Sequence, residues 1–180
     1  MEAILLINFD DVLHYTALSG NIDVAKINPH IYNSQILYLE PILGSDLYEK
    51  MISLVDTNDI NSSGYTEYKT LLDTYITPSL AFHTVELYIP LNAFQVADGG
   101  VYQMQATNAQ TSILSDIERI ATKYKVIGSK YDLKLDAFLK KNAVTYPEYQ
   151  YNAGLVHKTE VTQKSGWYLG VNKIGSKIRI

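Results

Sequence analysis

The residues best able to do chemistry are a histidine and a glutamate in the middle of the chain. His83 and Glu86 are three residues apart, so a helix would place both on one face. Their order is the reverse of the Glu-x-x-His pair of di-iron bundles, and such a site also needs a second pair and two further glutamates. The simpler interpretation is a half-buried histidine whose hydrogen bonds are satisfied. A hydrolase using His83 and Glu86 is the catalytic alternative, although no nucleophile stands beside them in the sequence.

A polar loop is the best candidate for a metal site. Asp56, Asn58 and Glu67 match positions one, three and twelve of an EF-hand loop. Ile60 and Asn61, however, occupy the positions that need an oxygen ligand and a glycine. The pattern therefore predicts a surface loop that holds no calcium.

Other catalytic patterns are absent from the sequence. Ser-x-x-Lys, Gly-x-Ser-x-Gly, Gly-x-Gly-x-x-Gly and Walker-type loops do not occur, and a chain without cysteine has no thiol nucleophile or thiolate zinc site. Asp10 and Asp11 are adjacent carboxylates, which a helix N-terminus favours in any case. We therefore expect no catalytic, metal or cofactor-binding residues, and no enzyme.

Charge divides the chain into two parts. The 180 residues are 47% apolar, with a net charge of −4. Residues 1–150 contain 10 Lys or Arg and 18 Asp or Glu, whereas residues 151–180 contain five basic residues and one acidic residue. An acidic body does not favour nucleic acid, because binding needs clustered cations against phosphates. No apolar run approaches the roughly 20 residues of a membrane helix.

Capping residues, prolines and apolar spacing predict a series of helices before residue 100. A short helix is expected from Asn8 to about residue 18. Asn28-Pro29 and Thr77-Pro78 look like helix starts, whereas Pro41 looks like a stop and Pro90 like a stop or a kink. The predicted helices therefore span residues 28–39, 44–55, 66–76 and 77 to about 90, followed by a break at 98–100 and an extended piece at 101–104.

The strongest signal is a long helix over residues 108–141. Apolar residues recur there at intervals of three and four, which makes one stripe along about 50 Å of helix. Gly128 is a candidate bend, and Tyr146-Pro147-Glu148-Tyr149 ends the helical part. The stripe consists of Ile113, Ile117, Ile120, Tyr124, Ile127, Tyr131, Leu135 and Phe138.

Residues 151–180 are β-rich, with a predicted hairpin around Lys164-Ser165-Gly166. So short a segment cannot form a stable sheet alone in water, so we expect its strands to pair with another molecule. The predicted fold class is mainly α: a helical bundle with one long helix in residues 1–150, plus a β-rich C-terminal extension in residues 151–180. The candidate partner interface on this extension is Val156, Lys158, Val161, Trp167, Tyr168, Leu169, Val171, Ile174, Ile178 and Ile180.

The order of these features resembles the head–tail connector proteins (adaptor, or neck ring) of tailed bacteriophages, in the type carried by Bacteroides phages, crAss-like ones included. The resemblance covers residues 3–150. Its most specific parts are the Leu43-Gly44-Ser45-Asp46-Leu47-Tyr48 turn and the ending Asn142 followed by Tyr146-Pro147-Glu148-Tyr149.

This resemblance implies a structural virion protein with no reaction and no cofactor. Such adaptors are α-helical bundles that form a dodecameric ring below the portal, which continues the DNA channel and joins the capsid to the tail. The implied partners are copies of this chain, the portal protein and further neck or tail proteins. Duplex DNA would pass without sequence-specific binding, and no membrane is involved. The implied location is the neck of the virion, after assembly in the host cytoplasm. The alternative is a non-viral helical module that binds an acidic partner through its basic C-terminal tail.

Overall fold

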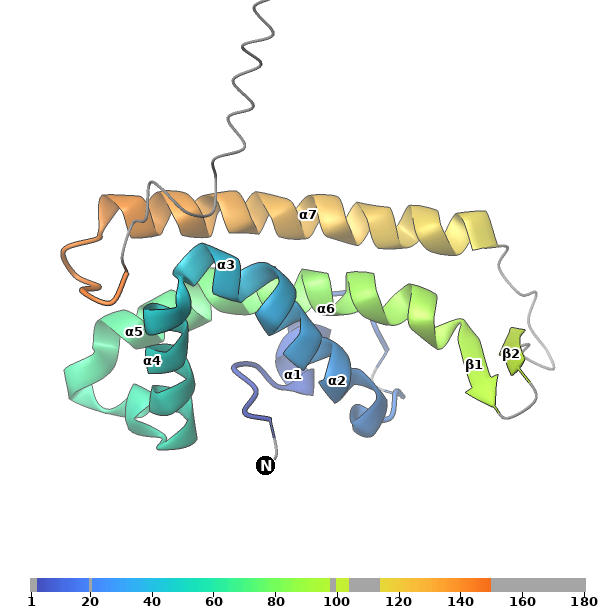
Figure 1. Ribbon diagram of the computed structural model, residues 1–180, viewed down its shortest axis with the longest axis horizontal. Coiled ribbons are helices and arrows are strands. Elements are labelled where there is room, and N and C mark those ends of the chain that lie inside the picture. The colour runs from blue at the N-terminus through green and yellow to red at the C-terminus, as the bar shows by residue number, and fades with distance from the viewer. Residues whose placement is uncertain (1–2, 20, 98–99, 104–113, 150–180) are drawn as a thin grey trace, which may run out of the picture.

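The computed structural model describes residues 3–19, 21–97, 100–103 and 114–149, which form a mainly helical body with one hairpin (Figure 1). This confirms the predicted helical class. The predicted C-terminal extension, residues 151–180 with its ten candidate interface residues, lies outside the described residues. The elements are α1 (Phe9–Tyr15), α2 (Val24–Ser34), α3 (Glu40–Leu43), α4 (Ser45–Asp56), α5 (Thr66–Leu71), α6 (Thr77–Asn92), β1 (Phe94–Ala97), β2 (Gly100–Gln103) and α7 (Leu114–Lys141).

The N-terminal segment is fixed by a cap and by a buried amide. Asn8 and Asp11 form a capping box at the start of α1, which confirms the predicted start, but the helix ends at Tyr15 rather than near residue 18. Buried Gln35 accepts a hydrogen bond from the backbone N–H of Leu6 through Oε1, at 2.7 Å. These contacts hold the first residues against the body.

Helix α6 begins at Thr77 as predicted, but it continues the preceding helical segment without a break, and it runs past Pro90 to Asn92. Pro41 and Pro78 both lie inside continuous helical runs, which contradicts the predicted stop at Pro41. Each follows a π-helical segment, Gln35–Leu39 or Leu72–Ile76, by two residues. The N–H groups of Glu40 and Thr77 bond to carbonyls five residues back. A proline ring clashes with the carbonyl four residues before it, and the wider π turn shifts that carbonyl. The chain therefore stays helical from residue 66 to residue 92.

Other boundaries also differ from the sequence expectation. The second helix begins at Val24, because the side chain of Asp23 caps the N–H of Ala25, and Pro29 lies within α2. The helix predicted over 44–55 is confirmed as α4, and α7 ends at Lys141 as predicted. The polar loop after α4 contains 3-10 turns, over Asp59–Asn61 and Ser63–Tyr65. Strand β2 matches the predicted extended piece and pairs antiparallel with β1, which was not predicted.

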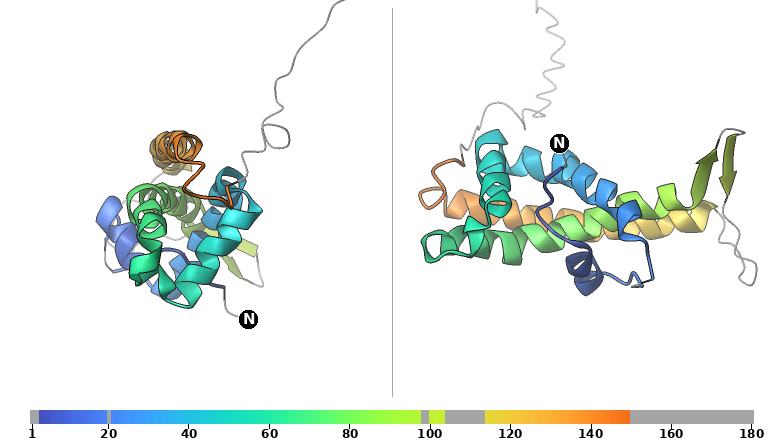
Figure 2. Two further views of the ribbon diagram at one scale, coloured as in Figure 1. Left: turned by 90° about the vertical axis from the view of Figure 1, so that its left-hand side faces the viewer. Right: turned by 90° about the horizontal axis from the view of Figure 1, so that it is seen from below.

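Helix α7 lies along α6 at one edge of the body (Figure 2), with smaller contacts to α3 and to the π segment Leu72–Ile76. The predicted apolar stripe is wrong in part. Ile120 and Ile127 are exposed, whereas the buried residues of α7 are Ile117, Ala121, Gly128, Leu135 and Leu139. In the part of the chain that the structure describes, no helix combines the length and apolar character needed to cross a bilayer.

Candidate functional site

The polar centre of the molecule lies where α6 and α7 pack together. On α6, Ser79, His83 and Glu86 are spaced by four and three residues, so they share one face. On α7, the facing residues are Lys125, Gly128 and Asp132, spaced by three and four. Ser79, near the start of α6, contacts Asp132, whereas Glu86, further along α6, contacts the earlier residue Lys125 of α7. The two helices are therefore antiparallel, and their two polar ridges face each other.

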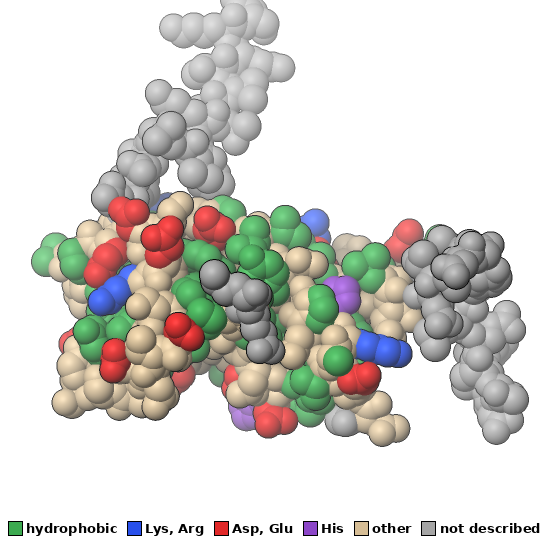
Figure 3. All heavy atoms as spheres, turned by 60° about the horizontal axis from the view of Figure 1, so that its bottom comes forward, with side chains coloured by type: hydrophobic (Ala, Val, Ile, Leu, Met, Phe, Trp, Pro, Cys, Tyr) green, Lys and Arg blue, Asp and Glu red, His purple; other side chains and the backbone are tan. Residues whose placement is uncertain are grey.

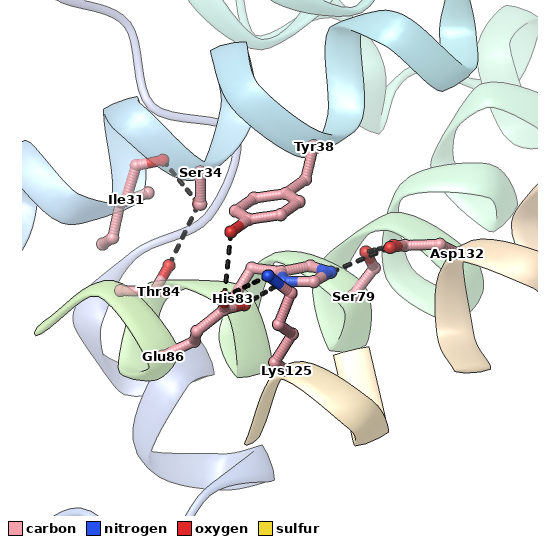
Figure 4. Close-up of polar contacts among 9 residues, drawn as sticks. All are labelled: Ile31, Ser34, Tyr38, Ser79, His83, Thr84, Glu86, Lys125 and Asp132. Carbon is pink, nitrogen blue, oxygen red and sulfur yellow. Dashed lines mark hydrogen bonds and ion pairs between the residues drawn. The ribbon is translucent and has the colours of Figure 1, made fainter. Parts of the chain in front are cut away.

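His83 connects the two ridges (Figure 4). Its Nδ1 lies 2.7 Å from Oε2 of Glu86 on the same helix, and its Nε2 lies 2.8 Å from Oδ2 of Asp132 on α7. Ser79 donates a hydrogen bond to the other oxygen of Asp132. The bonds to Asp132 join α6 to α7, and because the imidazole is fully buried, water does not compete for its ring nitrogens.

Two further contacts fix the plane of the imidazole. The Tyr38 ring, from the π segment Gln35–Leu39, stacks on His83 with centroids 3.8 Å apart, and its hydroxyl donates to Oε1 of Glu86 at 2.9 Å. Gly128 lies against the side of the ring that carries Nε2. A Cβ at Gly128 would stand 2.8 Å from both Cε1 and Nε2, so α7 can come this close only with glycine there.

The charges of this cluster balance. Burial by itself lowers the pKa of His83, but the hydrogen bonds from its ring to Asp132 and Glu86, and their negative charges, outweigh burial and raise the pKa above the ordinary 6.5. Lys125 places a second positive charge 3.7 Å from Glu86. Burial and the bond to Glu86 raise the pKa of Tyr38 to about 12, so its hydroxyl remains a donor. When the imidazole is protonated, two cations therefore face two carboxylates.

This arrangement gives His83 a structural role. Both ring nitrogens already bond to carboxylates of the chain, so no nitrogen is left to ligate a metal or to accept a proton from a substrate. The serine donates to Asp132 and not to the imidazole, so nucleophile and base are not adjacent as a triad requires. The predicted satisfied histidine is confirmed, although it is fully rather than half buried. The hydrolase hypothesis gains no support from this geometry.

The other sequence candidates serve local structure. In the polar loop, the side-chain oxygen of Asn58 accepts from the amide of Asn61, and a carboxylate oxygen of Asp59 accepts from Thr57. Within the described ranges, no group of three or more His, Asp or Glu side chains could hold a metal ion. Asp11 belongs to the capping box of α1.

Tyr38 was not predicted for this site, nor was Asp132, and Gly128 was predicted only as a bend of the long helix. One sequence signal could have indicated both Asp132 and Gly128. They belong, with Lys125, Leu135 and Leu139, to a series of residues at helical spacing on one face of α7. This series begins with charged and small residues, so its apolar periodicity is weaker than that of the stripe one position earlier, with which it shares Leu135. Nothing local marks Tyr38 as a partner of a residue 45 positions away.

The comparisons with known proteins place the sequence in a family but give no activity. Residues 39–159 match the Family of unknown function (DUF6712), a range that runs from the end of the first π segment through α7 and on to residue 159. No curated protein and no solved structure matches the chain.

Proposed function

The chain belongs to DUF6712, a family whose function is unknown, and we propose that it is a structural virion protein: a head–tail connector that forms a ring below the portal of a tailed bacteriophage. The ring continues the DNA channel and joins the capsid to the tail. The proposal starts from the resemblance of residues 3–150 to adaptor proteins, and the arrangement of the helices supports it.

The observation that carries the proposal is the position of α7. This 28-residue helix lies at the edge of the body and packs mainly along α6 (Figures 1 and 2). Its far side exposes Val126 and Leu133, which are 52% and 70% exposed. A long helix with one buried face and an outer face that exposes apolar side chains among charged ones is suited to form the wall between neighbouring subunits.

The central polar cluster agrees with a structural role. His83, Glu86 and Asp132 use their polar atoms to join α6 to α7, as far as the described contacts go. Such a cluster keeps a small helical body rigid while its surfaces bind other molecules. The acidic excess of residues 1–150 suits a channel wall, because DNA would not adhere to it.

The direct test is to locate the chain in particles. Antibodies against the purified protein are applied to tailed phage particles from cells that carry the gene, and gold labels are located by electron microscopy. Labels at the junction of capsid and tail are the expected result. A chain absent from purified particles would contradict the proposal and favour the alternative, a non-viral module whose basic tail binds an acidic partner.

A second experiment tests the C-terminal segment. A variant that ends at residue 153 is expected to retain the helical far-UV spectrum, because the described core ends at Tyr149, but to be missing from particles. Truncated protein that enters the neck normally would show that the segment is not the docking arm.

A further inference from the structure

The side of α7 turned away from α6 carries a second regular stripe. Its residues follow one another at intervals of four and three, all are exposed, and together they cover about 27 Å of helix. Three positions are cationic and three are apolar. This outer α7 stripe consists of Arg119, Lys123, Val126, Lys130, Leu133 and Ala137.

Charge is distributed unequally between α7 and the rest of the body. Helix α7 has seven Lys or Arg and four Asp or Glu, and one of these acids, Asp132, belongs to the buried His83 cluster. Residues 21–71 have seven Asp or Glu and three Lys. Figure 3 views the body from the side away from α7, where red carboxylates outnumber blue cations and apolar side chains lie among them.

A patch of matching character lies on the acidic part. Tyr32 on α2 and Ile36 and Leu37 on the adjoining π segment are exposed, and Leu37 is 58% exposed. Glu40 follows Ile36 by four residues and Leu37 by three, so it lies on the same side of the helical run. This outer α2–α3 patch therefore combines apolar groups with a negative charge.

Resting on the ring proposed above, we propose that the outer α7 stripe of one copy docks on the outer α2–α3 patch of a second copy. Opposite charges and exposed apolar groups on the two surfaces complement each other. Because the two patches are different, the contact is heterologous, and its repetition closes a ring when the rotation permits. An isologous contact between two α7 helices would instead bring like charges together.

Two other occupants of the stripe fit less well. The chain's own residues 151–180 are basic, with five Lys or Arg and one Glu, so they have the same sign of charge as the stripe. Duplex DNA would match the cations, but Val126, Leu133 and Ala137 occupy half of the stripe and give nothing to phosphates.

Cysteine cross-linking tests the contact, because the chain contains no cysteine of its own. Leu37→Cys and Leu133→Cys are made singly and together, and each protein is treated with a short bismaleimide. The double variant is expected to give dimers, trimers and higher species, and an equimolar mixture of the single variants should give dimers only. Neither single variant alone should exceed Val144→Cys, a control at a 99% exposed position outside both patches.

Three results would overturn the inference. Dimers from Leu133→Cys alone would show that two α7 helices meet. A double variant no better than the control would show that the patches do not meet, including the case of a monomeric wild-type chain. Wild-type monomers that bind duplex DNA, and lose it on Lys123→Glu and Lys130→Glu, would assign the stripe to DNA.

An independent readout is the strength of self-association. Leu133→Asp and Leu37→Asp are each expected to weaken it by at least about tenfold in sedimentation experiments, whereas Val144→Asp leaves it unchanged. The tests of the interface and the test on particles can fail independently of each other. Chain found in the neck without the predicted cross-links defeats the interface alone, and cross-links without chain in particles defeat the virion function alone.

Discussion

The two faces of α7 differ in what covers them and in what sets their chemistry. The inner face is buried through small and polar residues as much as through large apolar ones: Ala121 and Gly128 allow close approach, and Asp132 bonds to His83. The outer face exposes large apolar side chains such as Leu133. Apolar periodicity alone therefore does not identify the face that a long helix packs within its own chain.

The comparison implies that inner-face changes alter folding, whereas outer-face changes alter association. Removing the imidazole should have the largest effect. His83→Ala leaves Glu86 and Asp132, which are 11% and 19% exposed, without their shared partner. Breaking a buried ion pair from one side costs about 3–5 kcal/mol. We expect a loss of that size in the free energy of unfolding, measured by urea titration followed by far-UV circular dichroism.

The control for this variant is His14→Ala. His14 is an exposed residue on α1, and its replacement should change the free energy of unfolding by less than about 0.5 kcal/mol. Equal stability of the two variants would mean that the His83 cluster does not hold α6 to α7.

The contact of Gly128 with the imidazole predicts a smaller effect. In Gly128→Ala, the helix gains about 1 kcal/mol of intrinsic propensity, whereas overpacking a fixed ring costs about 1–3 kcal/mol. The ring cannot move aside easily, because both nitrogens are bonded and Tyr38 covers it. A net loss of up to about 2 kcal/mol is expected in the same titration. Gly64→Ala is the control, because a Cβ there would meet nothing within 4 Å; a Gly128→Ala variant more stable than wild type would refute the close contact.

These residues show how much of the fold and of the His83 cluster the sequence could predict. Local signals predicted helices and caps well: the Asn8 capping box and the end of α7 at Lys141 depend on neighbours in the chain. The predicted stop at Pro41 was wrong because a π turn, which has no local signature, removes the expected clash. The partners of His83 were missed because Asp132 is 49 residues away, and only packing brings it near.

The raised pKa of His83 predicts how stability depends on pH. The folded state binds the imidazole proton more tightly than the unfolded state, whose pKa is near 6.5. The stabilisation is therefore complete below about pH 6.5 and is lost as the pH rises through the folded pKa. We expect the urea midpoint to fall with increasing pH above this value, and the free energy of unfolding to fall in total by about 1.4 kcal/mol for each unit by which the folded and unfolded pKa values differ. His83→Gln should remove this dependence, and a wild-type midpoint that rises instead would show that the ring is buried neutral.

The smallest effect on folding is expected on the outer face, where a matched pair of leucines makes the comparison sharp. Leu133 and Leu135 are two residues apart on α7, but the first is 70% exposed and the second is fully buried. Leu135→Ala leaves a cavity and should cost about 2–5 kcal/mol. Leu133→Ala removes no buried contact and places the best helix former in a helix, so the free energy of unfolding should change by less than about 0.5 kcal/mol at concentrations where the chain is monomeric. If Leu133→Ala destabilised the monomer as much as Leu135→Ala does, the outer face would be covered within the chain itself, and no surface would be left there for a second copy.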